Sequence, residues 1–178
     1  MLKRGFLILM LATGLAACDD DSPTAPADPN LAVFTAQLSA LNEVGGGTPA
    51  TTNTETTARG DVRIEFRLTR DSANTVTGAT ATFIINFTGF PEGAVWRLAH
   101  IHRGVSGVAG GVVVDTGLTT AAQINLVNGG ITGHRFENIS VGGSLANEIL
   151  SNPSGFYFNA HTVVNPSGAV RGQLVWIQ

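Results

Sequence analysis

The chain has 178 residues, a formal net charge of −3, 22 glycines and only 13% charged residues. Apart from Lys3 and Arg4, its basic residues are scattered arginines. This excludes a nucleic-acid surface, which needs a basic stripe to neutralise phosphates, and a polybasic membrane patch.

The first residues have the pattern of a lipoprotein signal peptide, expected over residues 1–17. Lys3 and Arg4 form a positive start, and Gly5–Leu15 is an apolar segment too short to span a hydrocarbon core of about 30 Å as a helix. Two alanines precede Cys18, the single cysteine, so the pattern predicts acylation of Cys18 and cleavage before it. The alternative is an ordinary secretory signal with a chance cysteine. Two or more acyl chains, such as palmitate, would make a stable anchor.

Residues 18–31 are expected to form the lipidated cysteine and an acidic, proline-rich linker. Loss of the signal peptide would reduce the basic residues from 10 to 8, leave 13 acidic residues and change the formal charge to −5. A linker of this composition extends about 3.1 Å per residue, which would hold the next domain roughly 35 Å from the membrane. The sequence therefore predicts an exported protein of the bacterial cell envelope, lipid-anchored to the inner or outer membrane.

Residues 32–178 have the size and composition of one β domain. Strict alternation of apolar and polar residues predicts strands at 62–69 and 79–87. Turn residues at Asp71–Asn74 connect these two strands, and those at Asn165–Gly168 predict a hairpin between the last two. The other expected strands are 34–40, 95–102, 111–115, 123–127, 156–163 and 169–177.

One segment has helical rather than β periodicity. Leu145 and Ile149 have helical spacing, with Ser144 as the expected N-cap and Pro153 beyond the end. The glycine- and threonine-rich segment 45–57 is expected to be a long mobile loop. Antiparallel strands with one short helical insertion predict an all-β fold, either a Greek-key β-sandwich or a closed Greek-key barrel.

The sequence contains no catalytic motif that would indicate an enzyme. A P-loop, G-x-S-x-G, C-x-x-C and H-E-x-x-H are all absent, and no nucleophile is paired with a base. We therefore expect a non-enzymatic protein.

Three histidines form the candidate site. His100 and His102 lie two residues apart in an expected strand, so both face the same side, about 6.5–7 Å apart at Cα. If the strand of His161 is adjacent, three nitrogen ligands with an open fourth position suit Zn²⁺ or Cu²⁺. The alternative is a structural polar cluster, because the same alternation places His100 and His102 on one face with Trp96 and Leu98. No acidic residue is near them in sequence.

His134 and Arg171 are the other side chains considered. His134 follows a glycine in an expected loop and is predicted to lie on the surface. Arg171 lies in the last expected strand, where its guanidinium should be partly buried and needs acceptor oxygens. Bonds to backbone carbonyls or to a carboxylate are one interpretation, and an anion site is the alternative.

Four motifs in chain order resemble the CHRD domain, a family named after chordin and widespread in exported bacterial proteins. They extend over about residues 33–174 and are Phe34–Ser39 with Asn42-Glu43-Val44, Ala99–His102, Tyr157–Thr162 and Pro166–Leu174. The resemblance implies an all-β sandwich, immunoglobulin-like or dismutase-like, with no established biochemical activity. The family's His-x-His and Asn-x-His-Thr positions match His100, His102 and His161, which strengthens the metal interpretation and leaves the structural cluster as the alternative.

Some properties of related families are not expected here. Three glycines at 45–47 stand where prolines are common in CHRD domains, a change confined to a loop. The chain also has a remoter similarity to copper–zinc superoxide dismutase. It lacks the disulfide, the bridging histidine and the zinc-loop ligands of that enzyme. Chordin's growth-factor partners do not transfer to a bacterium.

The sequence thus leaves two functional hypotheses. The first is a membrane-anchored envelope lipoprotein that displays a CHRD-like binding or structural module for an envelope protein or glycan, with no established cofactor. The second is a metalloprotein that binds Cu or Zn through His100, His102 and His161, for metal buffering or redox chemistry.

Overall fold

The structure is a computed structural model that describes residues 28–45 and 53–178. The expected signal peptide, Cys18 and most of the expected linker lie outside the described residues. Within these two ranges, no helix combines the length and apolar character needed to cross a membrane.

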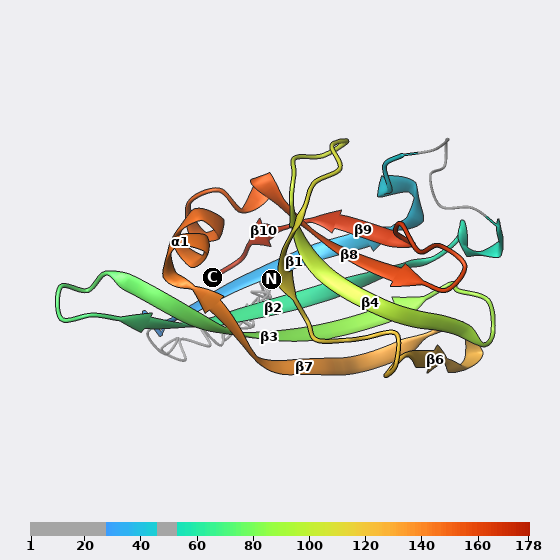
Figure 1. Cartoon of the computed structure of the whole chain (residues 1–178), viewed down its shortest axis with the longest axis horizontal. Helices are drawn as coiled ribbons and strands as arrows, with labels where there is room; N and C mark the ends of the chain where they lie inside the picture. The colour runs from blue at the N-terminus through green and yellow to red at the C-terminus, as the bar shows by residue number, and fades with distance from the viewer. Residues whose placement is uncertain (1–27, 46–52) are drawn as a thin grey trace, which may run out of the picture.

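The described chain is all-β with one short α-helix, which confirms the predicted fold class (Figure 1). The helix is α1 (Gly143–Ser151), and it packs against β3 and β7. The strands are β1 (Leu31–Ser39), β2 (Arg59–Arg70), β3 (Val76–Thr88), β4 (Ala94–Arg103), β5 (Val112–Asp115), β6 (Ile124–Leu126), β7 (Ile131–Gly142), β8 (Phe156–Thr162), β9 (Val170–Gln173) and β10 (Val175–Trp176).

Hydrogen bonds connect the strands in the order β5-β4-β8-β9-β1-β2-β3-β7, with β10 beside β1 and β6 beside β4. A single residue pair, Ser39 with Arg171, joins β1 to β9. The sheet curls at this junction, so that strands from its two parts, such as β3 and β8, pack against each other. We call β4, β5, β6, β8 and β9 the short half, and β1, β2, β3, β7 and β10 the long half.

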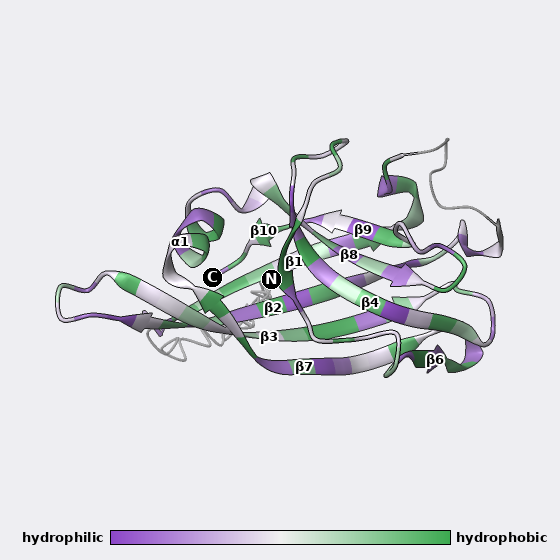
Figure 2. Cartoon of the chain, in the orientation of Figure 1, coloured by the Kyte–Doolittle hydropathy of each residue, from purple (hydrophilic) through white to green (hydrophobic). Residues whose placement is uncertain are grey.

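The core lies between the two halves. The rings of Phe83 on β3 and Phe158 on β8 are 6.0 Å apart, and those of Phe87 and Trp96 are 4.8 Å apart. Apolar and polar residues alternate along the strands, and the apolar ones form this core. Figure 2 shows the changes between apolar and polar residues along the strands. On β2, for example, Phe66 is fully buried, whereas the neighbouring Arg67 is exposed.

Both predicted turns are present. Asp71 Oδ1 accepts hydrogen bonds from the backbone N–H groups of Ala73 and Thr75, each at 2.9 Å, and Asn74 takes the left-handed conformation that the turn requires, with φ of 65°. The other turn connects β8 to β9 as a hairpin.

The sequence pattern did not predict β7, and the prediction that His134 lies in a surface loop was wrong. His134 is on β7, half-buried, with its ring 5.3 Å from Trp96. Two β-bulges in the β3–β7 pairing explain the error, because each adds a residue that breaks the period of two. Gly133 and Asn138, with φ of 66° and 61°, lie at these bulges.

Two other local expectations also need correction. Gly142, rather than Ser144, is the N-cap of α1, and it makes no side-chain capping bond. Within the expected mobile loop, residues 46–52 lie outside the described chain. Asn53–Glu55 form a 3-10 turn in which Glu55 is fully buried.

Candidate metal centre

A β-bulge in β4 decides which face carries the histidines. Trp96 and Leu98 pair with consecutive residues of β8, so β4 has one extra residue there. An extra residue reverses the alternation beyond it. Trp96 and Ile101 both pack in the core, and His100 and His102 therefore lie on the opposite face, away from the core. The expectation that they share a face with Trp96 is wrong.

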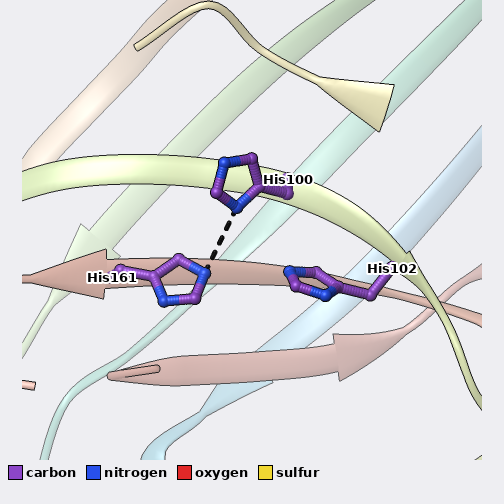
Figure 3. Close-up of side chains that lie close together, drawn as sticks. All are labelled: His100, His102 and His161. Carbon is purple, nitrogen blue, oxygen red and sulfur yellow. Dashed lines mark hydrogen bonds between the residues drawn. The ribbon is translucent and has the colours of Figure 1, made fainter. Parts of the chain in front are cut away.

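The three candidate histidines converge on this outer face of the short half, where Figure 3 shows their rings turned toward a common space. His100 Nδ1 lies 3.3 Å from His161 Nε2. The centroids of the three rings are 5.2 to 5.9 Å apart, and one nitrogen from each ring lies within 4.8 Å of the other two. All three side chains are buried, with His102 only 8% exposed.

The other nitrogen of each ring faces an oxygen atom. His102 Nδ1 lies 2.9 Å from the Gly110 carbonyl oxygen, and His161 Nδ1 lies 3.1 Å from that of Pro166. Because a carbonyl only accepts, each of these Nδ1 atoms carries the proton, and each Nε2 is left with a lone pair. His100 Nε2 lies 3.8 Å from the Asp115 carboxylate on the neighbouring strand β5.

The ring nitrogens that face one another in this cluster carry fewer protons than are needed for each lone pair to accept a hydrogen bond. His102 Nε2 is buried and has no hydrogen-bond partner among the described residues. If His100 donates from Nε2 to Asp115, three nitrogen lone pairs face one another. If it donates from Nδ1 to His161, its other lone pair faces a carboxylate instead. A cation among the three nitrogens removes this conflict, and the oxygens then orient the rings as outer-shell partners usually do for metal-bound histidine.

Burial lowers the pKa of all three imidazoles. The pKa of His161 falls to about 4, first because of burial and then because of the nearby His100. Burial also lowers the pKa of His100, partly offset by Asp115, and that of His102, partly offset by the bond to Gly110. The rings are therefore neutral at pH 7, the form that binds metal ions.

Comparison with protein families identifies the domain. The family model described as the CHRD domain matches residues 34–174. The chain belongs to the CHRD domain family. Comparison with curated proteins and with solved structures finds no significant match. The order of strands brings the four motifs of this CHRD domain together, because β4, β8, β9 and β1 are neighbours.

Arg171 and Tyr157 lie beside the histidine cluster, next to His102. The rings of His102 and Tyr157 stack at 4.9 Å with 9° between their planes, and the Arg171 Cζ atom lies 3.4 Å from the Tyr157 centroid. Arg171 Nη2 donates to the Val105 carbonyl at 2.9 Å and to Gln173 Oε1 at 3.1 Å. The structure thus places the buried guanidinium among oxygen acceptors and an aromatic ring.

Sequence reasoning did not single out Glu43 and Asn159 as site residues. Asn159 Nδ2 donates to Glu43 Oε2 at 3.4 Å. Burial raises the pKa of Glu43 to about 7, against the opposing effect of Arg171. Both residues stand inside the CHRD motifs, and that position was the available signal.

Glu55 is a further residue of the site that gave no sequence signal. Its Oε2 atom accepts hydrogen bonds from Thr162 Oγ1 and Asn165 Nδ2, each at 2.6 Å. These bonds fix the turn that presents the Pro166 carbonyl to His161. Glu55 lies in the segment expected to be mobile, where nothing in the local pattern indicates burial.

Proposed function

We propose that this CHRD domain is a binding module that holds a Cu²⁺ or Zn²⁺ ion through His100, His102 and His161. The observation that carries the proposal is the convergence of three buried imidazoles whose opposite nitrogens face oxygen atoms. Three nitrogen ligands suit both ions and leave room for a further ligand. The proposed role is metal binding, such as buffering or electron transfer, rather than catalysis.

We further propose that the module is displayed on the bacterial cell envelope, anchored by acyl chains on Cys18 and separated from the membrane by the linker. The support is the sequence of the first 18 residues. The second candidate is a module for an envelope protein or glycan, in which the histidines are only a structural polar cluster. Its support is the membership in the CHRD domain family, which fits a binding or structural module.

Metal titration separates the two candidates. The full chain, purified in detergent and stripped with a chelator, is titrated with Cu²⁺ and with Zn²⁺ by calorimetry. We expect one ion per chain for at least one metal, and loss of binding in His100→Ala, His102→Ala and His161→Ala. His134→Ala is the matched control, because its ring packs on Trp96 outside the cluster, and it should bind as the wild type does.

An outer-shell variant refines the result. Asp115→Asn should weaken metal binding by about 10- to 100-fold if the carboxylate orients His100, as is usual for such partners. Absence of binding by the wild-type chain, with histidine variants that only lose thermal stability, would establish the structural cluster instead.

A further inference from the structure

In the part of the chain that the structure describes, two oxygen acceptors of residues that neighbour the histidines also have no hydrogen-bond donor. Asn159 Oδ1 and Glu43 Oε1 are buried and unpaired among the described residues, as is His102 Nε2. A buried acceptor without a donor costs about 1–3 kcal/mol. Three such atoms at one site indicate that groups complementary to them belong there.

Asn159 lies between the histidines and Glu43. It pairs directly with His100 across β4 and β8, and it precedes His161 by two residues on the same face. Its side-chain N–H is directed to Glu43, and the residue is only 4% exposed. The side chain that carries the unpaired amide oxygen therefore lies on the same face of the short half as the imidazoles.

The structure provides a specific space for the Glu43 carboxylate. Gly168 has φ of +143°, and a Cβ atom there would collide with both carboxylate oxygens of Glu43. The residue before Glu43 is also fixed, because Asn42 Nδ2 donates to the Arg171 carbonyl oxygen at 3.0 Å. Glu43 is thus held against the site from two sides.

A metal ion alone would satisfy the imidazole nitrogens but would not supply a hydrogen to Asn159 or Glu43. A water molecule bound to that ion carries two hydrogens, and coordination makes them stronger donors. We propose that the centre has a fourth position occupied by water, and that Glu43 and Asn159 accept its hydrogen bonds. This inference rests on the proposed metal site and names its exchangeable ligand.

Pulsed EPR on the Cu²⁺-loaded full chain tests the inference, with copper content measured on each sample. The wild type in H₂O should show strongly coupled exchangeable protons that disappear in D₂O, distinct from the weaker couplings of the imidazole N–H groups. Glu43→Gln leaves one acceptor oxygen where two are needed, one for the Asn159 amide and one for the water, so these couplings should be lost or shifted at unchanged copper content. Glu137→Gln, at an exposed carboxylate on β7 paired with Arg135, is the matched control and should leave the spectrum unchanged.

Gly168→Ala provides a second variant that removes no ionisable group. By displacing the carboxylate, it should reproduce the spectral change of Glu43→Gln. Copper bound in full by all variants with spectra identical to the wild type would overturn this inference and leave the metal site standing. A wild-type chain that binds neither Cu²⁺ nor Zn²⁺ would overturn both proposals.

Discussion

At the scale of single residues, the titratable groups of the site respond to pH in opposite directions. The pKa of Glu43 is raised from 4.5 to about 7, so between these values the folded chain binds more protons than the unfolded chain. Its contribution to stability is therefore present below pH 4.5 and is lost as the pH rises to 7. His161, with a pKa lowered from 6.5 to about 4, makes the opposite contribution, which grows as the pH rises between those values.

Replacement of Glu43 by Gln isolates one of these contributions. In the metal-free chain, Glu43→Gln should gain stability relative to the wild type as the pH rises from 4.5 to 7, because glutamine does not have to ionise in a buried position. One pKa unit corresponds to about 1.4 kcal/mol, so a pKa raised from 4.5 to about 7 limits the gain to about 3.5 kcal/mol. Urea denaturation across this pH range, with a chelator present, measures the difference. A difference that stays constant with pH would contradict the raised pKa.

At the scale of elements, the sequence predicted strands where alternation is regular and failed where bulges interrupt it. The inward residues Val62, Ile64 and Phe66 follow a strict period of two, and β2 was predicted from them. The inward side of β7 carries Phe136 and Ile139, three residues apart across a bulge, so no such period exists. A bulge depends on how two strands pair, which a single strand's pattern does not reveal.

The candidate site shows the same limit. The spacing of His100 and His102 placed both on one face, but the bulge in β4 reversed which face that is. The Gly110 and Pro166 carbonyls that orient the rings belong to loops, and a backbone carbonyl has no sequence signature. Their positions follow from the packing of distant segments.

The regular strands permit a direct test of the core. Phe66 is fully buried, with its ring 5.2 Å from that of Phe34. Phe66→Ala should destabilise the domain by about 3–5 kcal/mol through lost burial and the cavity that remains. Leu41, which is 76% exposed, offers the control Leu41→Ala with an expected effect near zero. Equal melting temperatures for Phe66→Ala and the wild type would disprove the inward orientation of this face of β2.

At the scale of the whole molecule, chain connectivity brings Glu43, near the start of the domain, to Arg171, near its end. Ser39 and Arg171 form the one residue pair that joins the two halves of the described sheet. The short turn that follows β1 carries Glu43 from this junction to Asn159. The site is therefore assembled only when both halves are folded, and metal binding should report on the integrity of the whole domain.

The last prediction concerns the proposed anchor at Cys18, which is distant in sequence from every residue of the candidate site. Cys18→Ala should abolish labelling by radioactive palmitate and either release the protein from the membrane fraction or leave an unprocessed precursor. The variant should still bind metal as the wild type does, since every ligand and outer-shell residue lies between residues 43 and 171. His102→Ala provides the converse control, with labelling retained and metal binding lost. Unchanged fractionation and palmitate uptake in Cys18→Ala would show that the cysteine is not the site of attachment, whatever the metal content of the domain.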